Sequence, residues 1–220
     1  MRTLYRALAI TPIAFFSVLA SAQVAFNDFV SDSDSATYGY DQSTGWTVSG
    51  TGAGPGEFES ANKFTAGASG VISNLIIPIT LVGGTNTFTV EIVNDNSNAV
   101  GSTVIESWSA NSVGSFGSWS APDTLAGNGT GSLVSGTAYW IEVVANPLSS
   151  NGYGVFNWSG NDSGVGGTAG TDAYNTGTGW NYQSSTLGAF EINVQPAPEP
   201  FTVVGLAVGS LALLRRRKKA

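Results

Sequence analysis

Apolar residues in the middle of the chain recur at every second position, and this spacing is the strongest constraint on the fold. In the segment TNTFTVEIVND (85–95), Phe88, Val90 and Ile92 alternate with threonine and glutamate residues. Successive side chains of a β-strand point to opposite faces, so the pattern predicts a strand with one buried face. Residues 23–195, the body of the chain, lack the three- and four-residue apolar spacing of an amphipathic helix. The sequence therefore predicts a domain built from antiparallel strands.

Two further segments predict strong strands. GTAYWIEVVAN (136–146) is apolar on both faces, which predicts a central strand. GVISNLIIPITLVGGTN (70–86) predicts another strand, with Pro78 at a bulge or an edge. Gly83 and Gly84 are expected to turn this strand into a hairpin with the strand after it. Shorter strands are expected at 57–65, 153–158, 180–183 and 189–194.

The number and spacing of these strands predict the fold class of residues 23–195. We expect an all-β domain, an antiparallel two-sheet sandwich that is jelly-roll-like. A single-sheet barrel is the alternative. Segments 31–56 and 160–179 are rich in glycine, serine, threonine and asparagine and are expected to be loops.

The first 22 residues have the features of a secretory signal peptide. Arg2 and Arg6 precede an apolar stretch, and the segment ends in the small residues Ala20-Ser21-Ala22. A basic start, a short apolar helix and a small-residue cleavage site are typical of such signals. Cleavage is expected between Ala22 and Gln23, leaving an exported protein. The alternative is a buried N-terminal helix.

Charge restricts the partners of the body. Residues 23–195 contain fourteen acidic side chains and one basic side chain, Lys63, which gives a formal charge of −13. A single lysine cannot neutralise a run of phosphates, so nucleic acid is excluded as a partner. Anionic lipid surfaces and acidic polysaccharides would also be repelled unless a divalent cation bridged the charges.

The absence of histidine and cysteine from the sequence excludes most classes of enzyme mechanism. Serine and cysteine triads and zinc sites with these ligands cannot form, and the sequence has no phosphate-binding GxxxxGK[ST] loop. Glycoside hydrolysis needs only two carboxylates, and Glu57 and Glu59 are expected on one strand face. Outward-facing acids that keep the sheet soluble explain the same residues, so the protein is not expected to be an enzyme. No catalytic or cofactor-binding residue is assigned.

Calcium is the one cofactor for which the sequence offers candidates. The segment NDFVSDSDSATYGYD contains Asp28, Asp32, Asp34 and Asp41 in a region of turns. Ca²⁺ is held by carboxylate and loop carbonyl oxygens, although the spacing fits no EF-hand loop. A solvated acidic loop is the alternative.

Aromatic and threonine residues raise two binding hypotheses. An exposed indole can stack on a sugar ring, and five tryptophans lie in glycine-, serine- or asparagine-rich segments: Trp46, Trp108, Trp119, Trp158 and Trp180. The alternative is that they fill the core, as is expected of Trp140. Thr85, Thr87 and Thr89 offer a threonine row on one strand, a weak indication of ice binding.

The C-terminal 25 residues carry three features in a fixed order. Pro198-Glu199-Pro200 is followed by the apolar run 201–214 and then by the basic run 215–219. This order resembles the PEP-CTERM sorting signal of Gram-negative bacteria, a tail type also labelled "ice-binding protein C-terminal domain". The resemblance implies recognition and cleavage near the motif by the membrane enzyme exosortase. It also implies a surface or extracellular protein, often linked with exopolysaccharide and biofilm production.

The length and charge of this tail fit transient membrane insertion. Fourteen helical residues span about 21 Å, short of the ~30 Å hydrocarbon core, although snorkelling arginines extend that reach. The basic end is expected to stay in the cytoplasm and to hold the precursor in the inner membrane. The alternative is a permanent anchor.

The body resembles the choice-of-anchor group of surface domains, most closely the type called choice-of-anchor R. The resemblance is carried by NKFTAGASGVISNLIIPI, FTVEIVND, LVSGTAYWIEVV and AFEINV. It implies a β-sandwich with no defined activity, so it assigns no site residue. The expected function is that of an exported, non-enzymatic surface or matrix protein. The alternatives are a carbohydrate-binding module, with or without calcium, and, less favoured, an ice-binding protein or a glycan-active enzyme.

Overall fold

The computed structural model of the protein describes residues 21–160 and 166–196. These residues form strands and no helix, which confirms the prediction of an all-β fold. Consequently no described helix is long and apolar enough to span a membrane. The signal peptide up to residue 20 and the sorting motif Pro198-Glu199-Pro200 with its apolar run lie outside the described residues.

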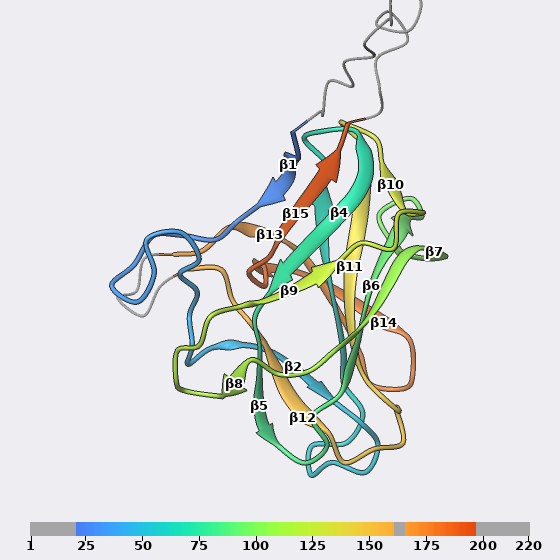
Figure 1. The fold of residues 1–220 in the computed structure, drawn as a ribbon. Helices are drawn as coiled ribbons and strands as arrows, with labels where there is room; N and C mark the ends of the chain where they lie inside the picture. Colours follow the sequence, from blue (N-terminus) through green and yellow to red (C-terminus); the bar gives the residue numbers. More distant parts are fainter. Residues whose placement is uncertain (1–20, 161–165, 197–220) are drawn as a thin grey trace, which may run out of the picture.

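The strands form three hydrogen-bonded sheets (Figure 1). The first sheet contains β1 (Gln23–Asn27), β15 (Glu191–Gln195), β4 (Gly70–Ile77) and β10 (Ser132–Leu133) in that order, and β9 (Asp123–Ala126) also pairs with β4. The second sheet contains β14 (Trp180–Thr186), β13 (Ala169–Asn175), β3 (Glu59–Thr65), β11 (Ala138–Ala145), β6 (Phe88–Asp95) and β7 (Val100–Ala110). The third contains β2 (Gly45–Ser49), β12 (Tyr153–Asn157), β5 (Ile79–Gly83) and β8 (Gly114–Ser115). Every pair is antiparallel except the short contact of β5 with β8.

Pro78 explains why there are three sheets where the sequence predicted two. This residue lies between β4 and β5, which follow one another along the chain but belong to the first and third sheets. Proline has no N–H to donate to a strand ladder, so the ladder ends there. Figure 1 shows β4 passing into β5 at this break. The result is a sandwich-like arrangement in which one side is divided into two sheets.

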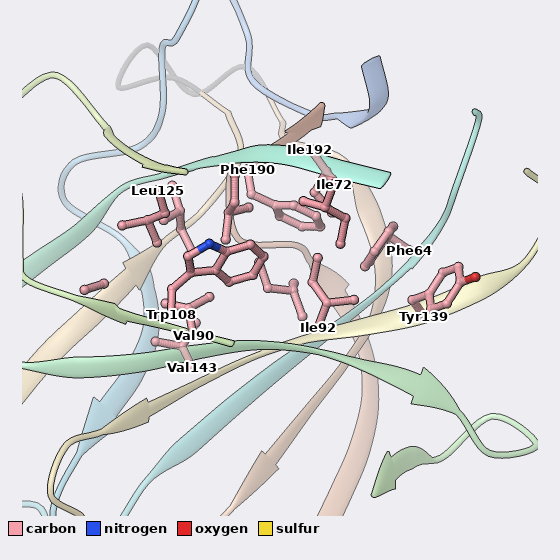
Figure 2. Close-up of a cluster of buried hydrophobic side chains, with 14 of the residues drawn as sticks. Phe64, Ile72, Val90, Ile92, Trp108, Leu125, Tyr139, Val143, Phe190 and Ile192 are labelled. Carbon is pink, nitrogen blue, oxygen red and sulfur yellow. The ribbon is translucent and has the colours of Figure 1, made fainter. Parts of the chain in front are cut away.

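One apolar core joins all three sheets. It runs from Ala25 in β1 to Val194 in β15, and the phenyl ring of Phe190 lies among the rings of three other phenylalanines. Its centroid is 4.5 Å from that of Phe26, 5.5 Å from that of Phe64 and 6.3 Å from that of Phe156. Figure 2 shows side chains from the facing sheets meeting in this core. Because the chain has no cysteine, these contacts and the strand ladders hold the sheets together.

The two strongest strand predictions are confirmed. Phe88, Val90 and Ile92 of β6 are fully buried, while the alternating Thr89 and Glu91 are half-buried on the other face. The strand β11 lies between β3 and β6, which is the predicted central position. The four shorter predicted strands correspond to β3, β12, β14 and β15.

The predicted hairpin at Gly83 and Gly84 is wrong. The strand β5 pairs with β12 and β8, whereas β6 pairs with β11 and β7, so the glycines carry the chain from one sheet to another. Gly84 has φ +77°, and a Cβ there would collide with the carbonyl oxygen of Asn151. The hairpin forms one strand later, between β6 and β7. Its central residues Ser97 and Asn98 have φ of 56° and 71°, as a type I′ turn requires.

Several strands lie where the sequence predicted loops. The strand β13 lies within the second loop-rich segment, β2 lies in the first, and β7 was not predicted. The strand β13 reads AGTDAYN and has little apolar alternation, but it is held between β3 and β14 by hydrogen bonds on both edges. Tertiary pairing therefore overrides a local composition typical of loops.

Truncation of Phe190 tests the role of the shared core. Phe190→Ala is expected to lower the free energy of unfolding by about 3 to 5 kcal/mol, because it leaves a cavity between the sheets. Urea denaturation followed by tryptophan fluorescence measures the change. Phe116→Ala is the control, since Phe116 is 39% exposed, and it should change stability by less than about 0.5 kcal/mol. Equal losses in the two variants would contradict the assignment.

Candidate functional site

A pocket of about 300 Å³ lies where β2 passes β3, β13 and β14. The side chains that line it are three aromatic rings and three hydroxyl or amide groups: Trp46, Phe58, Tyr174, Thr47, Ser60 and Gln183. None of the described side chains that line it belongs to Asp or Glu. The pocket therefore combines apolar faces with neutral hydrogen-bonding groups.

The floor of the pocket is the inner face of the second sheet. Ser60 lies two and four residues before Asn62 and Phe64 in β3, so all three point to the side that carries the apolar core. Tyr174 of β13 is paired with Ser60 across the sheet, and Asp172 is paired with Asn62. The core face thus changes from apolar at Phe64 to polar at Ser60.

A carboxylate beneath the pocket holds one of its lining groups. Gln183 of β14 lies opposite Asp172, and its Nε2 donates a hydrogen bond of 3.1 Å to Asp172 Oδ2. Burial raises the pKa of Asp172, and the hydrogen bond from Gln183 opposes this rise. The contact fixes the orientation of the Gln183 amide at the pocket.

The wall of the pocket is built around Trp46. Its Nε1 donates a hydrogen bond of 2.9 Å to the carbonyl oxygen of Thr186, and its ring lies 5.4 Å from that of Trp158. The preceding Gly45 allows β2 to lie close to β12, because a Cβ there would collide with the backbone of Phe156. Backbone contact, ring packing and one hydrogen bond therefore hold the indole in place.

Three polar atoms in this region are buried and have no hydrogen-bond partner among the described residues. They are Ser60 Oγ, Asn62 Nδ2 and Asp172 Oδ1. Unpaired buried polar groups are unfavourable, each by about 1 to 3 kcal/mol, and native structures contain few of them. Their concentration on neighbouring strands marks this end of the sheet as a polar site rather than as packed core.

The six tryptophans of the described residues differ in burial. Trp140 is fully buried, as predicted, and Trp108 is 9% exposed, with its Nε1 donating to the carbonyl oxygen of Ala126 at 2.9 Å. The other four are half-buried: Trp46, Trp119, Trp158 and Trp180. Trp46 is the only tryptophan among the described residues that line the pocket.

The four calcium candidates do not converge. Asp28 is buried, and its Oδ1 accepts a hydrogen bond of 2.8 Å from the N–H of Phe190. Asp32 and Asp41 accept hydrogen bonds from residues two or three positions ahead, and Asp34 accepts one from Gln42. The described residues contain no group of three or more acidic side chains arranged to hold a metal ion. The structure thus gives these carboxylates separate structural roles, and calcium binding stays a prediction.

Glutamates from three neighbouring strands form an acidic row on the outer face of the second sheet. Glu142 of β11 is paired with Glu91 of β6 and lies near Glu59 of β3. Burial, followed by the charges of Glu59 and Glu91, raises the pKa of Glu142 to about 7. Burial also raises the pKa of Glu59, with a hydrogen bond from Asn175 opposing and the charge of Glu57 adding to the rise. The row lies on the opposite face of β3 from Ser60 and the pocket.

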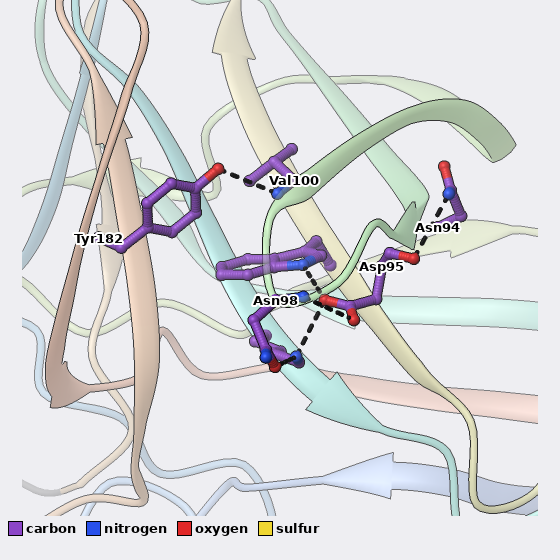
Figure 3. A network of polar contacts seen from close by, with 7 residues as sticks. Asn94, Asp95, Asn98, Val100 and Tyr182 are labelled. Atoms are coloured by element: carbon purple, nitrogen blue, oxygen red, sulfur yellow. Dashed lines mark hydrogen bonds and ion pairs between the residues drawn. The ribbon is translucent and has the colours of Figure 1, made fainter.

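The one basic residue of the body is held in a polar network on that outer face. Lys63 Nζ lies 2.9 Å from Asp95 Oδ1 and 5.8 Å from the centre of the Trp140 ring, and it donates to Asn98 Oδ1 at 2.7 Å. Trp140 Nε1 donates to the same Asp95 oxygen at 2.8 Å. Figure 3 shows this network beneath the β6–β7 turn. The only cationic side chain of the body is therefore part of a structural network.

Neither a known protein-family model nor a curated protein sequence matches the chain. Of the pocket residues, sequence reasoning singled out only Trp46. Ser60 was not singled out together with Tyr174 and Gln183 because β3 meets the β13–β14 hairpin only through a non-local pairing with β13. Thr85 and Thr87 of the threonine row lie before β6 begins, so only Thr89 belongs to that strand.

The buried carboxylate of Asp28 predicts that stability falls as pH rises. Burial raises its pKa from the ordinary 3.8 to about 8, although hydrogen bonds from backbone N–H groups oppose the rise. Between these values the folded state holds a proton that the unfolded state has lost, so the free energy of unfolding decreases from about pH 4 to about pH 8. Asp28→Asn is expected to reduce this slope and to be more stable than the wild type near pH 8. Urea denaturation at several pH values measures it.

The slope should be reduced rather than abolished, because Glu142 acts in the same direction up to about pH 7. Asp34→Asn, on the exposed loop nearby, is the matched control and should keep the wild-type slope. An Asp28→Asn profile parallel to that of the wild type would rule out the buried carboxylate as the cause.

The lysine network yields a second stability prediction. Burial on its own raises the pKa of Asp95, but hydrogen bonds from Lys63, Asn98 and Trp140, together with the charge of Lys63, lower it below 3.8. This stabilisation is present above about pH 4 and is lost as pH falls through the lowered pKa. Lys63→Met should cost about 1 to 3 kcal/mol at neutral pH, and less in acid. A double-mutant cycle with Asp95→Asn isolates the interaction, and zero coupling at neutral pH would contradict it.

Proposed function

We propose that the protein is an exported, non-enzymatic surface or extracellular-matrix protein of a Gram-negative bacterium, sorted by an exosortase-type membrane enzyme. Its working part is a single sandwich domain, jelly-roll-like, spanning residues 23–195. The tail inserts transiently and holds the precursor in the inner membrane until it is cut. The domain then functions at the cell surface or in an exopolysaccharide matrix.

The observation that carries this proposal is the position of both predicted processing sites relative to the strands. The strand β1 begins at Gln23, directly after the predicted signal cleavage position, and Ala22 and Gln23 are exposed. The strand β15 ends at Gln195, three residues before the sorting motif. Cleavage at either site would therefore leave the strand ladders intact.

The two strand ends also lie side by side. Gln23 is paired with Val194, so β1 starts where β15 finishes, and both lie at the top of Figure 1. A membrane-inserted segment at either end would therefore hold the same end of the domain towards the bilayer. The formal charge of −13 on residues 23–195 would repel the domain from anionic lipid and favour its solubility after release.

The absence of an enzymatic role is supported by the chemistry of the pocket. No carboxylate of the described residues lines it, whereas glycoside hydrolysis requires two across the substrate. Together with the lack of histidine and cysteine in the sequence, this favours binding over catalysis.

Mass spectrometry of intact protein from the native host tests the sorting. Protein recovered from the medium or matrix is expected to begin at Gln23 and to end near Pro198. Glu199→Ala should block tail cleavage and leave the chain in the membrane fraction, because it removes the only acid of the tail. Gln195→Ala, just before the motif, is the control and should be processed normally. Recovery of the wild type with an intact C-terminus in membranes would favour a permanent anchor and overturn the proposal.

A further inference from the structure

We propose that the pocket between β2, β3, β13 and β14 binds one ring of a neutral saccharide. The rings of Trp46 and Tyr174 would contact the C–H face of the sugar. The hydroxyls of Ser60, Thr47 and Tyr174 and the amide of Gln183 would bond the hydroxyl groups of the sugar. The inference deepens the proposed function, since it gives the exported domain a ligand class, but its test does not depend on how the chain is sorted.

The size of the pocket fits one ring rather than a buried chain. Pockets that bind small organic molecules occupy about 300 to 1,000 Å³, and this one, at about 300 Å³, is at the lower limit. Further rings of a polysaccharide would therefore have to extend into solvent beyond the pocket.

The lining combines the two surfaces that a sugar ring presents. A pyranose has an apolar face of C–H groups and a rim of hydroxyls. The pocket offers three aromatic rings, three hydroxyls, of which one belongs to Tyr174, and an amide. A purely apolar ligand would leave Ser60 and Gln183 covered without new partners, which is unfavourable. Ser60 is 1% exposed, and its Oγ has no hydrogen-bond partner among the described residues, so a ligand hydroxyl would supply one.

Charge selects against an acidic sugar. Lys63, the only base of the body, lies on the opposite face of β3 and is paired with Asp95. Asp172 lies beside the pocket through its contact with Gln183, and no described basic side chain offsets it. A uronic acid would meet a negative potential with no ion-pair partner, so a neutral sugar is favoured.

The recognition groups are held in place before a ligand binds. Asp172 fixes the amide of Gln183, and the carbonyl oxygen of Thr186 fixes the indole of Trp46. Tyr174 belongs to a strand that is hydrogen-bonded on both edges. Preorganisation of this kind reduces the ordering entropy lost on binding.

The pocket also lies far from the chain ends. Ser60 is near the start of β3, while the end of that strand leads to Gly67, whose N–H donates to the carbonyl oxygen of Ala25 in β1. Thr65 lies five residue steps beyond Ser60 along the strand, a distance of about 17 Å. A domain held at its β1–β15 end would therefore keep the pocket away from the point of attachment.

Isothermal titration calorimetry on the purified full chain, in a detergent without a sugar headgroup, tests the inference. The probes are cellobiose, mannobiose, galactobiose and diacetylchitobiose as neutral sugars, and digalacturonic acid as the anionic match. Binding of at least one neutral disaccharide is expected, with a Kd tighter than about 10 mM. Digalacturonic acid is expected to bind at least about tenfold more weakly than that disaccharide.

Substitution of two lining residues identifies the site. Tyr174→Phe and Gln183→Ala should each weaken binding about five- to tenfold, because each removes a polar group from the pocket. Tyr182→Phe is the control: it lies on the neighbouring strand, pairs with Ala173 on the outer face, and should bind as the wild type does. Circular dichroism checks that each variant is folded, and Gln183→Ala, at an exposed position, keeps the test valid if Tyr174→Phe does not fold.

Three results would overturn the inference. One is the absence of binding to any of the four neutral disaccharides. Another is an equal or greater affinity for digalacturonic acid, which would indicate a charge-driven site. The third is a loss of binding in Tyr182→Phe that matches the loss in Tyr174→Phe. A chain that is sorted as proposed but binds none of the sugars would refute this inference alone.

Discussion

The burial of Phe190 and its neighbours between the sheets is the interaction on which the rest of the structure depends. The chain has no cysteine, and its described residues form no helix, so the three sheets stay together only if their inner faces share one core. Phe190 directly precedes β15, the last described strand, and contacts rings from β1, β3 and β12, which brings the first and last described strands together. The break at Pro78 is tolerated because the core continues across it.

The same inner face becomes polar at the end where the candidate site lies. Along β3 the core-facing positions change from Phe64 to Asn62 and then to Ser60, and β13 follows with Asp172 and Tyr174. Unpaired buried polar atoms reduce stability, and a sequence selected for packing alone would place apolar residues there. Local departures from the rules of stable packing are expected at functional sites. The polar atoms at this end of the sheet therefore support the proposal that the pocket binds a ligand.

Electrostatics divides the domain into two faces. The outer face of the second sheet carries a row of glutamates and Lys63, which is paired with Asp95. The pocket on the inner face is lined by neutral groups. Burial raises the pKa of Asp28 and of Glu142, because a charge is unfavourable where these side chains lie. A high negative charge favours the solubility of the domain. The few buried carboxylates lower its stability at neutral pH, because burial disfavours their charged form.

The sequence by itself determined the all-β class, the buried faces of β6 and β11 and the lone cation, because these follow from alternation and composition. It did not determine the passage of the chain between sheets at Gly84, the strand β13 or the pocket. Polar segments such as AGTDAYN become strands only when neighbours supply both hydrogen-bonding edges. Ser60 likewise meets Tyr174 and Gln183 only through the non-local pairing of β3 with β13, and more than a hundred residues separate Ser60 from the other two. Tertiary structure alone decided that site, since strand register is set by the whole core and not by any one segment.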